Sequence, residues 1–267
     1  MTMDYSEYLA EVKTLRSPAT YEAYKAALKH FPNPTYKEVE KFIENPKYSS
    51  ATKKHRLRIL GMALRWYNEE GLIPRIDKGV RRLIKGYREN KTTEPCPTDE
   101  QVELAWDQLG NNRDRAMFAL MAYNGLRIGE VYKLDRSDVD MEHNTVTLRG
   151  TKGKKDAIVP LVHERVKGYL YAWMTESDAR NKALFTGPNG RLSCNYLKVK
   201  FHDVFHDLGM NFHAHSLRRY YANSMRNAGV SLENMCVAMR HSNVTTTMRY
   251  LNISQQDIVD SLKRTWA

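Results

Sequence analysis

The sequence predicts a mainly α-helical protein of two domains, with a small antiparallel β-sheet in the second domain. Three observations support this fold class. Apolar residues recur at helical spacing along most of the chain, a polar stretch with prolines interrupts the pattern before residue 98, and a period-two alternation appears after residue 140. The predicted order is a helical domain over 1–90, a linker over 91–97, and a second domain over 98–267 that ends in a tail over 251–267.

The first domain is predicted to consist of helices throughout. Two helices over 1–30 are separated at Ser17 and Pro18, where the serine can cap and the proline suits a first helical position. A short helix over 35–45 and a long helix over 51–70 follow. The long helix has an apolar stripe formed by Leu57, Leu60, Leu64 and Tyr67.

The long helix also carries basic side chains on a face away from its apolar stripe. Between Lys53 and Lys91, twelve Lys or Arg residues stand against four Asp or Glu residues. A basic helix with an apolar back can lie along duplex DNA and neutralise phosphates, although a solvated charged face is the alternative. The candidate DNA-binding residues are Lys53, Lys54, Arg56, Arg58 and Arg65.

The second domain is predicted to begin with a helix that Thr98 caps. Two alternating segments then indicate a β-hairpin whose turn is rich in lysine. The expected elements are a helix over 98–109, a helical pair over 113–134, strands over 145–149 and 157–161, helices over 163–176 and 195–208, a helical span between 218 and 241, and an apolar helical stripe in the tail.

Charge and composition indicate the kind of partner. The chain has 267 residues and a formal charge of +11, which favours a polyanion such as nucleic acid, although a generally basic soluble surface is the alternative. The three cysteines are far apart, and no signal peptide or membrane-length apolar run is found. We therefore expect a protein of a reducing cytoplasm that does not enter a membrane.

Four residues near the carboxyl end form the main candidate site. His215 and Arg218 are three apart, so a helix places both on one face, where they can bind an anion and transfer a proton. His241 and Tyr250 follow. A phenol is a poor nucleophile at its ordinary pKa and needs positive neighbours and a base. The pattern suggests attack by tyrosine on a phosphodiester, but in a chain with sixteen tyrosines ordinary packing is the alternative.

A second group of candidate residues lies upstream. Arg127 follows Gly125, which allows a sharp turn, and Glu130 is placed to hold the guanidinium, although a surface ion pair is the plain alternative. Lys152 lies in the lysine-rich turn, which is either a mobile catalytic loop or a solvated charge cluster. The turn lacks the spacing of a Walker phosphate loop.

No metal site or cofactor is expected. His202 and His206 are four apart on a predicted helix, but Asp203 stands where a zinc protease would need Glu and no third ligand is evident. We interpret both histidines as helix surface residues.

Taken together, the candidate residues resemble the tyrosine recombinase, or phage integrase, family. The order and spacing of six residues are similar to its catalytic set, and residues 97–252 carry the resemblance firmly. Residues 1–90 loosely resemble the family's helical core-binding domain, so the resemblance implies a core-type DNA-binding domain over 1–90 and a catalytic domain over 98–267. Two positions depart from the pattern, because Asn124 and Arg219 stand where many members have Thr and His. The six matching residues are Arg127, Lys152, His215, Arg218, His241 and Tyr250.

The resemblance implies a site-specific integrase or Xer-type recombinase, of the kind found in phages, archaeal viruses and plasmids. Tyr250 would form a 3′-phosphotyrosyl link to duplex DNA, and Glu130 would support Arg127. The partner would be a DNA recombination site, bound by a homo-tetramer on synapsed DNA that is a monomer in solution. Integration, excision and dimer resolution are the expected outcomes.

Two other functions fit the same residues. A type IB topoisomerase would use the same chemistry to relax DNA as a monomer. A non-catalytic, sequence-specific DNA-binding factor would keep the fold without the reaction, although the complete set of six residues argues against it.

Overall fold

A computed structural model of the chain describes residues 3–73, 75–90, 95–150, 156–241 and 243–248. The chain divides into two compact units, 1–93 and 94–267, and each is described by itself. Lys152, Tyr250 and the tail over 251–267 lie outside the described residues. The DNA-binding and catalytic roles assigned to the two domains stay predictions.

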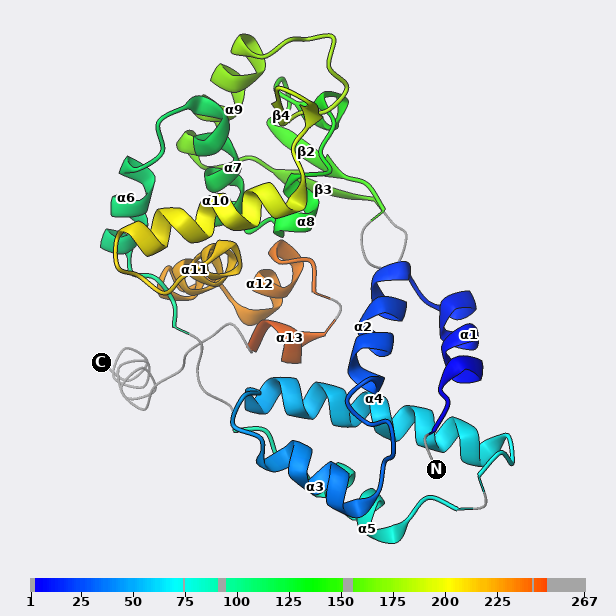
Figure 1. Cartoon of the computed structure of the whole chain (residues 1–267). Coiled ribbons are helices and arrows are strands. Elements are labelled where there is room, and N and C mark those ends of the chain that lie inside the picture. Colours follow the sequence, from blue (N-terminus) through cyan, green and yellow to red (C-terminus); the bar gives the residue numbers. More distant parts are fainter. Residues whose placement is uncertain (1–2, 74, 91–94, 151–155, 242, 249–267) are drawn as a thin grey trace, which may run out of the picture. The chain divides into compact units, whose positions relative to one another are not determined.

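The first unit is helical (Figure 1), as predicted. The break at Ser17 and Pro18 is present, and the Ser17 side chain accepts a hydrogen bond from the Thr20 amide. The fifth helix was not predicted; Asp77 caps it through the Val80 amide. The helices are α1 (Ser6–Leu15), α2 (Pro18–Leu28), α3 (Tyr36–Glu44), α4 (Ser50–Glu69) and α5 (Lys78–Gly86).

Helix α4 is the central element of the first unit. Its predicted apolar stripe is buried, but Ile59 and Ala63 are fully buried as well, so the buried face is wider than predicted. The reason is that α1, α2 and α5 all contact α4. A helix with several neighbours needs more apolar positions than one that lies on a single surface.

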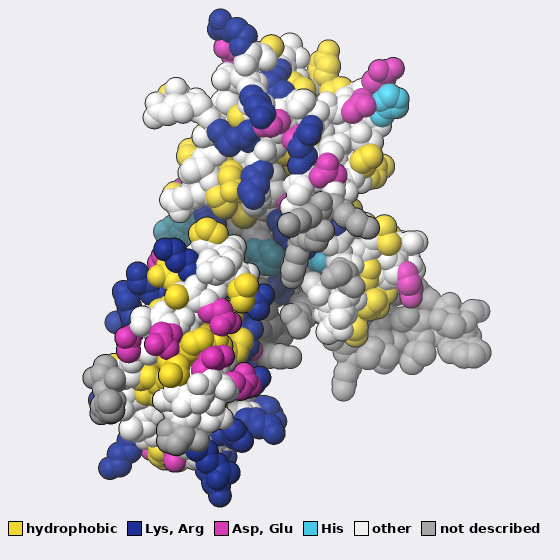
Figure 2. Space-filling model, turned by 90° about the vertical axis from the view of Figure 1, so that its right-hand side faces the viewer, with side chains coloured by type: hydrophobic (Ala, Val, Ile, Leu, Met, Phe, Trp, Pro, Cys, Tyr) yellow, Lys and Arg dark blue, Asp and Glu magenta, His cyan; other side chains and the backbone are white. Residues whose placement is uncertain are grey.

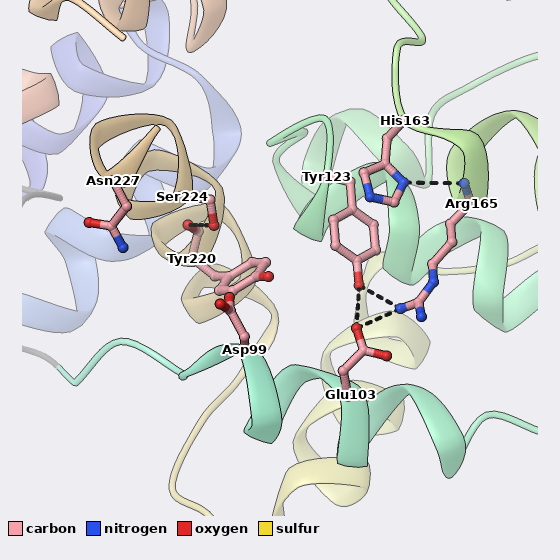
Figure 3. Close-up of a pocket in the computed structure, with 8 residues that line it drawn as sticks. All are labelled: Asp99, Glu103, Tyr123, His163, Arg165, Tyr220, Ser224 and Asn227. Atoms are coloured by element: carbon pink, nitrogen blue, oxygen red, sulfur yellow. Dashed lines mark hydrogen bonds and ion pairs between the residues drawn. The ribbon is translucent and has the colours of Figure 1, made fainter. Parts of the chain in front are cut away.

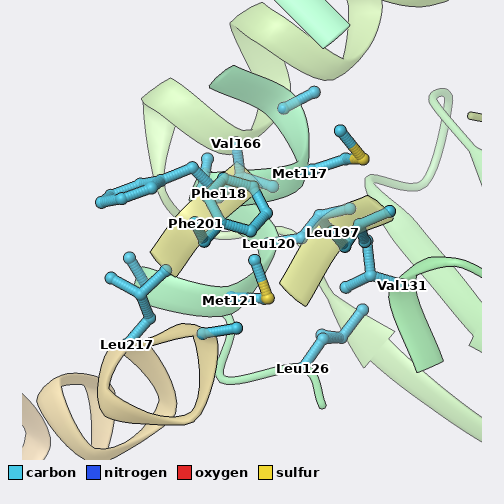
Figure 4. Close-up of a cluster of buried hydrophobic side chains, with 14 of the residues drawn as sticks. Met117, Phe118, Leu120, Met121, Leu126, Val131, Val166, Leu197, Phe201 and Leu217 are labelled. Carbon is cyan, nitrogen blue, oxygen red and sulfur yellow. The ribbon is translucent and has the colours of Figure 1, made fainter. Parts of the chain in front are cut away.

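Helices also dominate the second unit, and α7 lies at its centre. Every residue of α7 from Ala116 to Ala122 is buried, because α8, α9 and α11 pack around it; Figure 4 shows the side chains that meet there. The helices are α6 (Asp99–Asp107), α7 (Asn112–Ala122), α8 (Ile128–Val131), α9 (Glu164–Glu176), α10 (Cys194–Asp207), α11 (Ala214–Asn227), α12 (Leu232–Ala238) and α13 (Val244–Met248).

The second unit contains the predicted β-hairpin. Strands β2 (Thr145–Leu148) and β3 (Ala157–Pro160) pair antiparallel, with Val146 opposite Val159. A two-residue strand β1 (Val139–Asp140) pairs with β2, and β4 (Thr186–Gly187) pairs with β5 (Gly190–Arg191). These three short strands and the 3₁₀ turn at Arg136–Asp138 were not predicted, since two or three residues show no periodicity. The predicted fold class is confirmed.

Candidate active site

A glycine turn after α7 builds the first part of the site. Gly125 has φ +60°, and a Cβ atom there would lie 2.2 Å from the ring of Tyr221. Only glycine satisfies both conditions. The Asn124 side chain donates a hydrogen bond of 2.6 Å to the Pro160 carbonyl of β3. The turn is therefore held between the sheet and α11, and it delivers Arg127 to the start of α8.

Arg127 is held by Glu130, as the spacing predicted. One carboxylate oxygen accepts from the Arg127 Nη1 at 2.9 Å, and the other accepts from its backbone amide at 2.8 Å. The Arg127 side chain is 40% exposed, whereas that of Glu130 is 16% exposed. The carboxylate thus fixes one side of the guanidinium and leaves the exposed part of the group accessible to an anion.

Arg218 lies on α11 and is fully buried. Its Nη1 donates to the Gly125 carbonyl, and its Nη2 donates to the Met239 carbonyl at 2.5 Å and to His241 Nε2 at 3.0 Å. These bonds fix the plane of the guanidinium, because its donors have a rigid geometry. Three segments far apart in the sequence, namely the glycine turn, α11 and the end of α12, therefore meet at Arg218.

The protonation state of His241 follows from its neighbours. Nε2 accepts from Arg218, so in the neutral ring the proton is on Nδ1, which donates to Thr247 Oγ1 at 2.8 Å. Burial, together with the positive charges of Arg218, Arg127 and Arg240, lowers the pKa of His241 to about 4. The ring is uncharged at neutral pH. Thr247 is buried and also contacts Cys236 Sγ at 3.1 Å.

Arg240 belongs to the same group and was missed by the sequence analysis. Its Nη2 lies 3.0 Å from Glu130 Oε2, so one carboxylate binds two guanidinium groups. Burial lowers the pKa of Arg240, and Glu130 opposes this effect. Arg240 directly precedes His241 in the sequence, and this position alone could have suggested a place in the site. Adjacency to a histidine does not distinguish it from a surface arginine. We call the group the guanidinium cluster: Arg127, Glu130, Arg218, Arg240 and His241.

His215 is near this cluster in sequence but differs from it in exposure. It is the second residue of α11, one turn before Arg218, and its side chain is exposed. The ring lies 6.4 Å from that of His213. Lys152 and Tyr250, the remaining predicted catalytic residues, are outside the described part of the chain.

A polar pocket of about 520 Å³ lies beside the end of α7, and no residue of the guanidinium cluster lines it. Tyr123 ends this helix, and its ring stacks on His163 with 4.1 Å between centroids. Arg165 Nη1 donates to Glu103 at 2.7 Å and to the Tyr123 hydroxyl at 3.0 Å. Figure 3 shows these side chains pointing toward one another. Because Tyr123 directly precedes the glycine turn, this network helps to fix the turn that carries Arg127.

Within the described residues, no cluster of three or more His, Cys, Asp or Glu side chains can hold a metal ion. His202 and His206 stack on each other with exposed side chains, and each contacts the aspartate that follows it. They are surface residues of α10, as the sequence predicted. No described helix is long and apolar enough to cross a bilayer.

The predicted DNA-binding residues of α4 differ in their surroundings. Arg58 and Arg65 are exposed, whereas the other three are half-buried. Lys54 Nζ donates to the Tyr87 carbonyl at 2.7 Å, and the Arg56 guanidinium lies 4.4 Å from the Tyr48 ring centroid. Two of the five candidates thus stabilise the first unit itself. On the face shown in Figure 2, Lys and Arg side chains are spread over the upper and lower parts of the view.

Sequence comparison identifies the family to which these residues belong. The sequence model described as the phage integrase family matches residues 98–257, which is more than half of the chain. The chain belongs to the phage integrase family. Its members are tyrosine recombinases, enzymes that cleave and rejoin DNA in site-specific recombination, and the chain is one of them.

Curated relatives of the phage integrase family match this chain over different lengths. A tyrosine recombinase of Thermosipho africanus is 26% identical and covers 97% of both chains. XerA of Thermococcus onnurineus is 31% identical over 55% of this chain and 53% of its own length. XerC of Neisseria gonorrhoeae is 35% identical over 53% and 47%, respectively.

Solved structures of integrases share the fold at low sequence identity. The Tn1549 transposon integrase, solved with circular intermediate DNA, is 15% identical with a TM-score of 0.77 and 98% coverage of both chains. A lambda integrase dimer bound to a core site is 17% identical with a TM-score of 0.75, covering 96% of this chain and 100% of the other. These likenesses concern the fold, and both proteins were solved bound to DNA.

Proposed function

We propose that Tyr250 is the nucleophile of this recombinase and that the guanidinium cluster binds the scissile phosphate of duplex DNA. The observation that carries the proposal is the charge of the cluster. Arg127 and Arg240 bind a single carboxylate, Glu130, and Arg218 binds the uncharged His241. A preorganised excess of positive charge is what a phosphodiester needs as negative charge grows on its non-bridging oxygens.

The proposed reaction is a transesterification: one phosphoester bond forms as another breaks, so that no cofactor is required. The Tyr250 hydroxyl oxygen bonds to phosphorus, and the bond from phosphorus to the 5′-oxygen breaks. His215 takes the phenol proton and Lys152 gives a proton to the leaving oxygen. Arg127 and Arg218 stabilise the pentacoordinate transition state, and His241 keeps Arg218 in position. The phosphotyrosyl ester stores the energy of the broken bond, so that a second 5′-hydroxyl can reverse the step.

The first unit is proposed to bind the recombination site through α4. Arg58 and Arg65 are the exposed arginines of this helix, so they can reach phosphates without a change in the packing of the first unit. A homo-tetramer would assemble on two synapsed sites in the cytoplasm from subunits that are monomers in solution. Integration, excision and dimer resolution all use this chemistry.

A nicked-duplex selection tests the proposal without a known target sequence. Purified protein is incubated with a pool of random duplexes, each carrying a nick just downstream of a variable position, so that cleavage releases a short fragment and traps the enzyme. Covalent adducts are recovered under denaturing conditions and sequenced. The wild-type chain is expected to enrich one site, and Tyr250→Phe is expected to yield no adduct while it still binds the selected duplex.

Other tyrosines serve as controls for this experiment. Tyr171 is exposed on α9 and is not part of the proposed site, so Tyr171→Phe should form adducts like the wild-type chain. An adduct that persists in Tyr250→Phe would show that another residue attacks. A wild-type chain that binds but never forms an adduct would favour the non-catalytic DNA-binding factor.

A further inference from the structure

Four described helices end with the same pair of backbone hydrogen bonds. In α4, α10, α11 and α12, the second residue past the C-cap donates to the carbonyl five residues earlier, and the residue before it donates to the carbonyl three earlier. This termination requires a left-handed residue at the first position past the cap, and glycine usually fills it.

The chain uses glycine at three of these ends and arginine at the fourth. Gly71, Gly209 and Gly229 have φ values of +71°, +69° and +77°. Arg240 occupies the equivalent position after α12 with φ +55°. A left-handed conformation costs a non-glycine residue about 1–2 kcal/mol. A strained residue next to a proposed catalytic histidine calls for a functional explanation.

The side chain of Arg240 makes contacts that glycine cannot make. It is 13% exposed, with Nη2 at 3.0 Å from Glu130 Oε2 and Nη1 donating to the Ala238 carbonyl at 3.1 Å. Its Nε is buried and has no hydrogen-bond partner among the described residues. A buried guanidinium with an unsatisfied donor is expensive to keep for stability alone.

We propose that Arg240 is a positioning residue for the recombinase reaction: it fixes Glu130, and through that carboxylate it sets the position of Arg127. Glu130 Oε2 is shared between Arg240 Nη2 and the Arg127 amide, while Oε1 holds the Arg127 side chain. The carboxylate is therefore clamped from two sides. Without Arg240 it can rotate, and Arg127 loses its fixed approach to the phosphate. This inference rests on the proposed function of the cluster.

Arg240 also belongs to the charges that face His241. Among the described residues, the charges that act on this ring come from Arg218 of α11, from Arg127 and Glu130 at the start of α8, and from Arg240 beside it. The Thr247 hydroxyl accepts from its Nδ1. Removal of one positive neighbour stabilises the protonated form of the ring relative to the neutral form. The Arg240→Gly variant is therefore expected to raise the pKa of His241 from about 4 toward its ordinary value.

The test compares Arg240→Gly, which relieves the left-handed strain and removes the guanidinium, with Arg240→Lys, which keeps the charge. The matched control is Asn144→Gly, which replaces the other left-handed non-glycine residue of the described chain, outside the site. Each protein cleaves a nicked duplex of the sequence selected by the wild-type enzyme, in single turnover at saturating DNA. We expect Arg240→Gly to cleave about 100-fold more slowly, Arg240→Lys about 10-fold more slowly, and Asn144→Gly normally.

Two further readouts separate positioning from a structural role. The unfolding temperature of Arg240→Gly should not fall, because glycine is the preferred residue at this helix end. NMR titration of the histidine ring protons, with the His241 signal identified by its absence in His241→Gln, should show the raised pKa. A slower rate with an unchanged His241 pKa and a lowered unfolding temperature would overturn the inference.

A double-mutant cycle with Glu130→Gln tests the route of the effect. If Arg240 acts through Glu130, then Arg240→Gly should cost little additional rate in the Glu130→Gln background. Fully additive losses would mean that Arg240 acts directly on the phosphate, and the positioning role would be wrong. If the wild-type chain and Arg240→Gly cleave at the same rate, this inference is wrong but the proposed function stands. If the wild-type chain does not cleave, the proposed function itself is wrong.

Discussion

The guanidinium cluster and the basic face of α4 are both rich in arginine, yet they use it in opposite ways. In the cluster, Arg127, Arg218 and Arg240 bond to a shared carboxylate or to backbone carbonyls; Arg218 is fully buried and the Arg240 side chain is 13% exposed. On α4, Arg58 and Arg65 point into solvent. The first arrangement fixes the positions of its charges, whereas the second leaves them free to follow a ligand.

This difference predicts different responses to mutation. A network that shares atoms behaves as a unit, so changes to one member displace the others and their effects do not add. Exposed cations on a helix each neutralise about one phosphate, so their losses add and depend on salt. The first region should thus control the rate of strand cleavage, and the second the affinity for DNA.

The largest effect should come from the glycine turn, because Arg218 and Arg240 both donate to the Gly125 carbonyl. Gly125→Ala combines a left-handed alanine with a Cβ atom 2.2 Å from Tyr221. We expect a loss of about 3 kcal/mol in the free energy of unfolding, and loss of cleavage even where the protein remains folded. Urea denaturation and single-turnover cleavage measure the two effects.

Gly209→Ala is the matched control for the glycine turn. Gly209 is also left-handed, with φ +69°, but a Cβ atom there would meet nothing within 4 Å. We expect a loss of about 1 kcal/mol and a normal rate. Equal losses for the two variants would mean that the close approach of Tyr221 does not constrain the cluster.

A smaller effect should come from Thr247, which sets the tautomer of His241. Thr247→Val keeps the shape but removes the hydroxyl that accepts from Nδ1, so the ring no longer has to present its Nε2 lone pair to Arg218. We expect cleavage to slow about 5-fold, since one hydrogen bond contributes about 1 kcal/mol. Thr247→Ser keeps the hydroxyl and should remain close to the wild-type rate; a wild-type rate for the valine variant would contradict the tautomer assignment.

The smallest effect on the chemical step should come from α4. Replacing Arg58 and Arg65 with glutamine should remove about two phosphate contacts and so reduce the slope of log DNA affinity against log salt concentration. The cleavage rate at saturating DNA should stay unchanged. Fluorescence anisotropy across a salt series measures the slope. Arg180→Gln, at an arginine outside α4 whose side chain is 91% exposed, is the control. An unchanged slope for the double variant would show that this helix face does not contact DNA.

Much of the site was predictable from local spacing. The contact between Arg127 and Glu130 depends on three residues of separation at the start of a helix, and the position of Arg218 one turn after His215 depends on α11 alone. The hairpin and the first four helices of the first unit likewise follow from periodicity and capping residues, whereas α5 was not predicted. Such features are local, so the sequence contains all the information that determines them.

Arg240, Thr247 and the engagement of Lys54 could not be predicted in this way. Arg240 meets Glu130 across 110 residues, and Lys54 meets the Tyr87 carbonyl across 33. Nothing in the sequence around either residue distinguishes it from a lysine or arginine exposed to solvent. Thr247 is one of three consecutive threonines, and only burial against Cys236 and His241 distinguishes it from the others.

The sequence by itself determined the helical class, the hairpin, the net positive charge and the order of the candidate catalytic residues. Only the tertiary structure decided which cations are fixed in the cluster and which remain exposed. The physical reason is that propensity and periodicity act over a few residues, whereas the environment of a charge depends on every segment that packs around it.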